Sequence, residues 1–299
     1  GYLGVRGTLE GNSHSFHVGT YLNGFYDTRP IEYDEAAFGL ARNSQTMLNI
    51  PDARNISFFL DDEPFDLTAG NILRHGRILD LKQGLLFRET EWKSPSGKSV
   101  IIESQRLVSF TRPHLMAVRY SVRPLQEGST LRVISFLDGT VRNLVTGEDP
   151  RTGSRIGGEA LRPFGGWAEG GQGVLRARTK NSGLSLASAV SHSWKEGTGD
   201  ILRCVYENQR ICLEITCPGN TEEPFVLYKY AAYYHGLAGE EERLEKKSLK
   251  ELKKAQAAGF EALMKEQETY LFEFWQRSDV KVAGDPLVQQ SLRFNLFHI

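Results

Sequence analysis

The sequence predicts a mainly β fold: a large antiparallel β-sandwich (super-sandwich) followed by helices. From residue 16 to about 234, short runs rich in β-branched and aromatic residues alternate with Gly, Pro, Asp and Asn. No helical pattern separates these runs, so crossover helices are lacking and the strands are expected to pair antiparallel. After Gly239 the pattern changes abruptly to helical spacing.

The strands are expected where apolar and β-branched residues are most concentrated. These runs cover residues 56–60, 99–109, 115–122, 131–137, 184–190, 201–206, 211–216 and 225–233. Residues 94–97 should form a hairpin turn, because Pro95 fixes one φ angle and Gly97 permits a positive one.

A stretch rich in Gly and Arg lies between residues 147 and 173. We expect a long irregular loop here, and such loops in compact domains are usually either functional or disordered. An ordinary surface loop and a substrate-facing loop both fit this composition. In the second case, Trp167 would be a stacking surface for a sugar or Arg155 a polar clamp.

Three helical segments are expected after Gly239. Residues 240–242 are acidic and lysines follow, an order that the helix dipole favours. From residue 260 to 275 apolar side chains recur at spacings of three and four, with Gln267 the one polar member. Burying each apolar side chain is worth about 1.5–3 kcal/mol, so this face must lie on the β domain or on a further domain. Asp285 and Pro286 begin a last helix, which no stop signal ends.

Composition excludes some partners. With 36 Lys and Arg against 37 Asp and Glu, the net charge is -1, so neither nucleic acid nor an anionic membrane is an expected partner. The three cysteines match no common zinc spacing and are expected to be reduced, buried thiols. No stretch approaches transmembrane length and no signal pattern is present, which favours a cytoplasmic location.

The common catalytic motifs are absent. Gly97, Lys98 and Ser99 imitate the end of a phosphate-binding loop, but they join two strands rather than a strand and a helix. The sequence contains no G-x-S-x-G elbow and no H-E-x-x-H motif. His14 and His17 are three residues apart, but no further ligand lies nearby, so an exposed pair is expected rather than a metal site.

Paired carboxylates are what glycoside chemistry requires. One cluster, at residues 61–63, precedes Pro64 and is expected to form a turn between strands; the other comprises Glu32, Asp34 and Glu35. Both could be charged loop tips. The residues alone therefore identify no catalytic site.

Several blocks of the chain together resemble the N-terminal part of glycoside hydrolase family 65, which includes the inverting phosphorylases of α-linked glucose disaccharides. These blocks are "GYLGVRG" at 1–7, "GTYLNGFYDTRPI" at 19–31, "RILDLKQGLLFRE" at 77–89, "RLVSFTRPHLMAVRYSV" at 106–122 and "WQRSDVKVAGDPLVQQSLRFNLFHI" at 275–299. The form of residues 23–52 is more similar to the trehalose-phosphorylase branch than to the maltose branch.

The resemblance implies a domain layout. Residues 1–238 would form the β-sandwich, 239–278 a helical linker, and 279–299 the first helix of an (α/α)6 catalytic barrel cut off at the end of this sequence. The general acid, a Glu, and the phosphate-binding groups would belong to that barrel, so no catalytic residue and no metal ligand is assigned to this chain. The complete enzyme is expected to be a homodimer.

The resemblance also implies a reaction. The Glu would protonate the glycosidic oxygen while inorganic phosphate attacks the anomeric carbon from the opposite face, which yields β-glucose 1-phosphate without any cofactor. Two alternatives remain: a non-catalytic carbohydrate-binding or structural β-sandwich module, and a segment of a related α-glucoside hydrolase. An apolar helix face left exposed would argue against a free-standing module.

Overall fold

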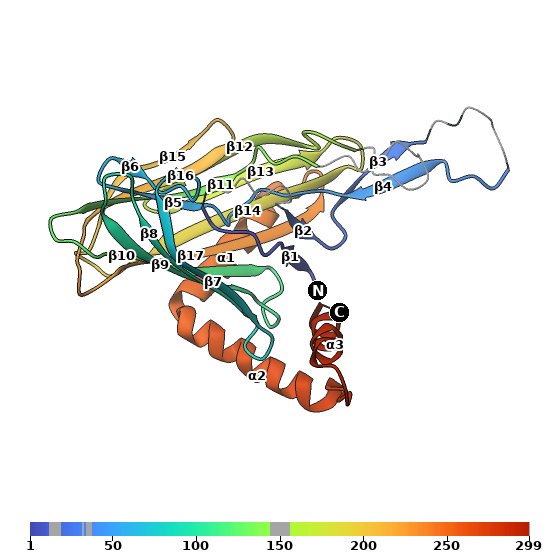
Figure 1. Ribbon diagram of the computed structural model, residues 1–299. Coiled ribbons are helices and arrows are strands. Elements are labelled where there is room, and N and C mark those ends of the chain that lie inside the picture. The colour runs from blue at the N-terminus through green and yellow to red at the C-terminus, as the bar shows by residue number, and fades with distance from the viewer. Residues whose placement is uncertain (12–18, 32, 34–37, 144–155, 299) are drawn as a thin grey trace.

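The computed structural model describes residues 1–11, 19–31, 33, 38–143 and 156–298. Two antiparallel sheets form a sandwich (Figure 1). Helices α1 (Glu241–Ala258) and α2 (Phe260–Ser278) run along the outer face of the larger sheet, and α3 (Pro286–His298) follows them. The predicted antiparallel β-sandwich is confirmed.

The larger sheet has eight strands in the order β12-β13-β14-β17-β10-β9-β8-β7, and every neighbouring pair is antiparallel. In chain order these are β7 (Asn71–Asp80), β8 (Leu85–Lys93), β9 (Ser99–Val108), β10 (Leu115–Pro124), β12 (Leu161–Glu169), β13 (Gln172–Thr179), β14 (Leu184–Ser193) and β17 (Phe225–Leu237).

The smaller sheet has five strands in the order β15-β16-β11-β5-β6. They are β5 (Ile56–Leu60), β6 (Glu63–Pro64), β11 (Thr130–Asp138), β15 (Asp200–Glu207) and β16 (Arg210–Pro218). Two further pairs are β1 (Leu3–Val5) with β2 (Thr20–Leu22), and β3 (Tyr26–Pro30) with β4 (Asn43–Met47). Each run predicted to be a strand is a strand. The predicted turn at 94–97 is also present, with Gly97 at φ 93° and the Ser94 N–H donating to the Lys98 carbonyl at 2.7 Å.

Two apolar layers hold the architecture together. The first fills the space between the sheets and includes Trp92, Phe58 and Phe25, none of them accessible to solvent. The second lies between the larger sheet and the helices, where Leu252 of α1 and Leu263 of α2 are buried. The amphipathic face predicted from residue 260 onward therefore lies on the sandwich.

The stretch expected to be a long loop is largely a β-hairpin. Residues 161–169 form β12, and β13 begins at Gln172 after a tight turn in which Gly170 and Gly171 have φ 56° and 83°. Glycine occurs inside β12 for a packing reason: a Cβ on Gly166 would lie 2.6 Å from the Val174 carbonyl oxygen and 2.8 Å from the Tyr206 ring. The expectation of an irregular loop was wrong over residues 161–173. The glycines here allow strands to pack closely, and a glycine-rich composition is also typical of loops.

Polar side chains also connect the two sheets through the core. Lys229 of β17 is buried and donates from Nζ to the carbonyls of Asn55 at 3.0 Å and Phe136 at 2.7 Å. Nε2 of His192, on β14, lies 2.8 Å from the Ser135 hydroxyl of β11. Nδ1 of the same ring lies 2.7 Å from the Gly171 carbonyl oxygen. Because that carbonyl can only accept, Nδ1 carries the proton and Nε2 accepts from the Ser135 hydroxyl.

The strand pair β3–β4 extends away from the sandwich as an arm (Figure 1). Its anchor is Asp27, whose fully buried carboxylate accepts from the backbone N–H groups of Asn181 at 3.0 Å and Ser182 at 2.7 Å. The Asn181 side-chain amide donates to the same carboxylate at 3.2 Å. One acidic side chain thus ties the arm to the turn between β13 and β14.

Candidate functional site: a cleft between the sandwich and the C-terminal helices

Helix α2 is attached to the sandwich by the polar residue on its buried face. Gln267 is inaccessible to solvent, donates from Nε2 to the Gly84 carbonyl at 2.6 Å and accepts the Phe110 N–H at Oε1 at 3.2 Å. Both partners are backbone groups of turns at the same end of the larger sheet. The single polar member of the predicted apolar face therefore satisfies two backbone groups that would otherwise be buried unpaired.

Two further side chains strengthen this attachment. Arg112 makes a bidentate ion pair with Glu266 of α2, at 3.0 and 2.8 Å. Trp275 donates from Nε1 to the Leu81 carbonyl at 2.8 Å. The turns at 81–84 and 109–112 are consequently held in fixed positions relative to α2.

Helix α3 is attached far more weakly. It has no buried residue, and Leu287, Val288 and Phe294 are 66%, 52% and 49% exposed. Its contact with the sandwich is made near its end, where Phe297 meets Phe110 edge to face at a centroid distance of 5.4 Å. The ion pair between Arg293 and Asp279, at 2.7 Å, joins α3 to the end of α2 rather than to the sheet.

A cleft of about 890 Å³ lies between the N-terminal residues, the end of the larger sheet, α2 and α3. Its walls are mainly aromatic and apolar, with two arginines, Arg77 and Arg106, among the lining residues. No Asp or Glu lines it among the described residues. The cleft can take up apolar and aromatic groups, but it cannot supply the carboxylates that glycoside cleavage requires.

The N-terminal wall of the cleft is formed by residues 1–5 and Gly7. Gly7 belongs to residues 6–10, here called the amino-terminal strap. Arginine side chains hold its carbonyl groups: Arg106 donates to Arg6 and Thr8 at 3.3 and 3.1 Å, and Arg77 donates to Gly7 at 2.6 Å. Before the strap, Tyr2 stacks on His235 of β17 with ring centroids 5.6 Å apart. The amino-terminal segment is therefore held by side chains from β7, β9 and β17.

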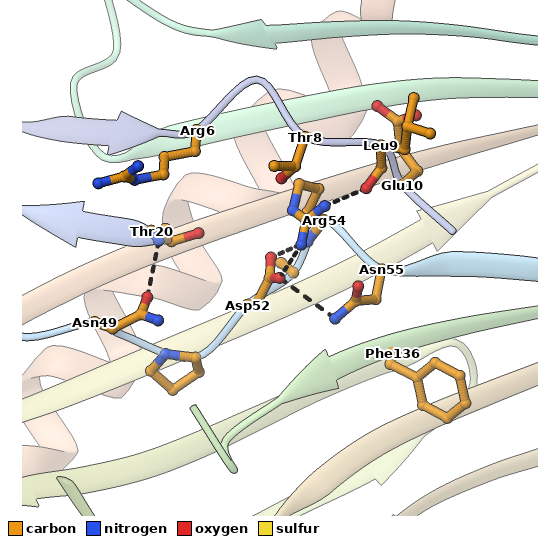
Figure 2. A network of polar contacts seen from close by, with 12 residues as sticks. Arg6, Thr8, Leu9, Glu10, Thr20, Asn49, Asp52, Arg54, Asn55 and Phe136 are labelled. Atoms are coloured by element: carbon orange, nitrogen blue, oxygen red, sulfur yellow. Dashed lines mark hydrogen bonds and ion pairs between the residues drawn. The ribbon is translucent and has the colours of Figure 1, made fainter. Parts of the chain in front are cut away.

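Figure 2 shows the inner side of this region. Arg54 donates to the Leu9 carbonyl and forms a 2.8 Å ion pair with Asp52, to which Asn55 also donates at 3.4 Å. Arg54 and Asp52 are both buried. The sequence does not reveal this network, because Asp52, Arg54 and Asn55 match no known short motif and Leu9 lies 45 residues from Arg54.

The residues proposed from the sequence are dispersed. Trp167 lies in β12 and donates from its indole Nε1 to Glu245 of α1 at 2.8 Å, so its ring is packed between the sheet and a helix. Its suggested contact with a sugar stays a prediction. Arg155, like His14 and His17 and the acidic group Glu32, Asp34 and Glu35, lies outside the described residues.

The acidic cluster at 61–63 forms the predicted turn between β5 and β6. Asp61, at φ 55°, accepts the Thr130 N–H at 2.8 Å and pairs with Lys98. Glu63 accepts from the Ser96 hydroxyl at 2.6 Å. These carboxylates are used by neighbouring loops and do not line the cleft.

All three cysteines are free; Cys212 and Cys217 are buried as predicted, whereas Cys204 is only half-buried at the edge of the sheet. Over the described ranges, no group of three or more His, Cys, Asp or Glu is placed to hold a metal ion. No helix in the described part of the chain has the length and apolar character needed to cross a membrane.

The Ser135–His192 pair has the geometry of a nucleophile with its base, yet it offers no catalytic site. Ser135 is 1% exposed and His192 is 7% exposed, and the pair lies between the sheets. A substrate could not reach the hydroxyl, so the pair is a structural bridge.

Comparison with known proteins agrees with this architecture. The chain is 35% identical to an α,α-trehalose phosphorylase of Thermoanaerobacter brockii over 303 residues, covering all of this chain and 39% of that protein. It is 33% identical to an uncharacterized glycosyl hydrolase of Mycobacterium tuberculosis, covering all of this chain and 38% of that protein. The solved structure of a human-microbiome protein assigned as a kojibiose phosphorylase superposes with a TM-score of 0.84 at 21% identity, covering 99% of this chain and 38% of that one.

The extent of these matches shows how this chain relates to longer proteins of one family. The chain spans less than two fifths of the length of each relative named above. Residues 1–274 match the family model described as "Glycosyl hydrolase family 65, N-terminal domain". The chain therefore belongs to glycosyl hydrolase family 65.

Proposed function

We propose that this chain is the N-terminal segment of an inverting α-glucoside phosphorylase. The reaction would convert a disaccharide and inorganic phosphate into β-glucose 1-phosphate and glucose or another acceptor, with trehalose the favoured disaccharide. The observation that carries the proposal is the 35% identity to an α,α-trehalose phosphorylase across the whole chain. The kojibiose phosphorylase fold neighbour, at 21% identity, supports the architecture only.

The proposed chemistry explains why one carboxylic acid is sufficient. An inverting hydrolase needs a second carboxylate to activate water. Phosphate is already ionised at neutral pH and is itself the nucleophile, so the enzyme must only protonate the leaving oxygen and hold the phosphate opposite it. Both tasks would belong to protein outside this chain, in an (α/α)6 catalytic domain.

Within this proposal, the chain is a scaffold without activity of its own. Two observations support that role. The cleft has no carboxylate among its described lining residues. Helix α3 has no buried residue and presents Leu287, Val288 and Phe294 to solvent, whereas α2 buries one face on the sandwich. A helix with such an apolar surface needs a partner, and we propose that α3 begins the catalytic helical domain.

The test uses the complete protein that carries this chain. It is incubated with trehalose, kojibiose or maltose, with and without phosphate, and glucose 1-phosphate is followed by proton NMR, which distinguishes the anomers. We expect phosphate-dependent release of the β anomer, fastest from trehalose, and no turnover by the 299-residue chain alone.

Other outcomes would reject separate parts of the proposal. Cleavage that does not require phosphate would identify a hydrolase of the same family. Release of the α anomer would exclude inversion, because trehalose is an α-glucoside. Faster turnover of kojibiose would reject the assigned substrate but keep the reaction class.

A further inference from the structure

A group of buried polar side chains lies beneath the amino-terminal strap, on the inner face of the larger sheet. Arg88 of β8 is directly opposite Ser104 of β9, which is directly opposite Tyr120 of β10. Arg106 follows Ser104 on the same face of β9, and Glu10 of the strap completes the group. We call these five residues the buried arginine cluster.

The charges of the cluster do not balance. Glu10 is its one carboxylate, and it lies 3.4 Å from Arg88 Nε and 3.4 Å from Arg106 Nη1. The neighbouring Arg54 is already matched by Asp52. Two guanidinium groups therefore share one carboxylate at distances longer than those of a charge-assisted hydrogen bond, which leaves one excess positive charge.

This excess charge is almost completely shielded from bulk water. Arg88 and Arg106 are each 4% exposed, Glu10 is 2% exposed, and Tyr120 is inaccessible. A buried charge is strongly unfavourable unless an opposite charge and hydrogen bonds compensate it. Burial alone would raise the pKa of Glu10, but the charges of Arg88 and Arg106 lower it below its usual value, so Glu10 is ionised. Its negative charge is the one included in the balance above.

The cluster also contains unused hydrogen-bond donors. Among the described residues, no acceptor is within hydrogen-bond geometry of any of the three Arg88 nitrogens, of Arg106 Nη1 or of the Tyr120 hydroxyl. The Arg88 guanidinium lies 5.7 Å from the centre of the Tyr120 ring, so these donors belong to adjacent side chains. Buried donors are nearly always paired in folded proteins, so this cluster requires an acceptor from elsewhere.

We propose that the buried arginine cluster binds one small monovalent inorganic anion, with chloride as the reference ligand. A single negative charge matches the excess of one, and a spherical acceptor can receive N–H and O–H donors from several directions. Burial raises the pKa of Tyr120 to about 12, so its hydroxyl keeps a proton to donate. Arg106 also borders the cleft, which gives the ion a route from solvent.

The first test is the thermal unfolding of the 299-residue chain at constant ionic strength, with sodium chloride replaced stepwise by sodium gluconate. We expect Tm to rise with chloride and to saturate, with a total shift on the order of 2–4 °C. Arg88→Met should lose this response. The matched control is Arg74→Met, on the neighbouring strand, because Arg74 is exposed and should leave the response unchanged. Equal Tm in both salts, or a response retained by Arg88→Met, would overturn the proposal.

A second measurement keeps the proposal testable if Arg88→Met fails to fold. Crystals of the unaltered chain are transferred to bromide, and anomalous scattering is measured at the bromine edge. We expect a peak within hydrogen-bond distance of Arg88 and Tyr120. Water density without anomalous signal at that position would show that ordinary water satisfies the donors and that no anion binds.

Discussion

Gln267 of α2 and Gly84 of the β7–β8 turn are joined by a 2.6 Å hydrogen bond across 183 residues of sequence. Gln267 also accepts a hydrogen bond from the Phe110 N–H, so this one side chain connects α2 to two turns of the larger sheet. Replacing Gln267 by Met keeps its approximate length but leaves both backbone groups unpaired. We expect a loss of about 2–4 kcal/mol in the free energy of unfolding, measured with urea. Gln276→Met, at an exposed position of the same helix, is the control and should change stability by less than about 0.5 kcal/mol.

Gly84 should tolerate no side chain. Its φ is 66°, and a Cβ would lie 2.5 Å from Gln267 Nε2 and 2.7 Å from a methyl carbon of Leu271. Gly84→Ala should therefore destabilise the protein by about 2–4 kcal/mol, from backbone strain and from overpacking together. Gly128→Ala separates the two effects, because Gly128 has a similar φ of 73° but nothing within 4 Å of an added Cβ. Equal losses for the two variants would show that packing against α2 is unimportant.

The anchor of the β3–β4 arm can be tested at Asp27. An Asn at this position would direct an amide N–H₂ toward the N–H groups of residues 181–182. Asp27→Asn should therefore lower the free energy of local unfolding of the arm by about 1–3 kcal/mol. We expect faster amide hydrogen exchange in β3 and β4, with exchange in β10 unchanged. Asp62→Asn, at an exposed turn position, serves as the control. Unchanged protection of the arm would contradict the anchoring role.

Because His192 is buried, it should make the free energy of unfolding depend on pH. Burial, assisted by the charge of Lys229, lowers the pKa of His192 to about 3, against about 6.5 in an unfolded chain. Between these values the unfolded chain binds a proton that the folded chain does not. The stability contributed by neutral His192 is therefore complete above pH 6.5 and is lost as the pH falls toward 3, with a slope of at most about 1.4 kcal/mol per pH unit.

The measurement is urea unfolding at several pH values between 7 and 4. His192→Gln stays neutral throughout, so the stability difference between the unaltered protein and this variant should shrink as the pH falls. His298→Gln, at the exposed end of α3, should run parallel to the unaltered protein. Parallel curves for His192→Gln would show that protonation of His192 is not coupled to unfolding.

Local patterns in the sequence were sufficient for β5, β9–β11 and β14–β17, for the turn at 94–97 and for the amphipathic face of α2, but they did not predict the other strands. They could mark Gln267 as unusual, but not identify its partners, because Phe110 lies 157 residues away and both partners are backbone groups without a sequence signature. The hairpin containing Gly166 was missed for a different reason. Its glycines serve close packing of strands, and composition cannot distinguish that from the freedom of a loop.

The buried charges could not be predicted from the sequence either. Arg106 reaches Thr8 across 98 residues, and Arg54 reaches Leu9 across 45. Nothing in the sequence near either arginine distinguishes it from one on the surface. Such a site follows from tertiary structure alone, whereas the family resemblance followed from blocks of sequence and did not show what those blocks do.

The attachment of the amino-terminal strap has a consequence for the order of assembly. Its carbonyl groups are held by Arg77 and Arg106, and the preceding Tyr2 rests on His235. Residues 2–10 are synthesised well before β7, β9 and β17, which carry these partners, and contacts so distant in sequence form slowly. Residues 2–10 therefore stay without their full set of partners until β17, which carries His235, has been synthesised.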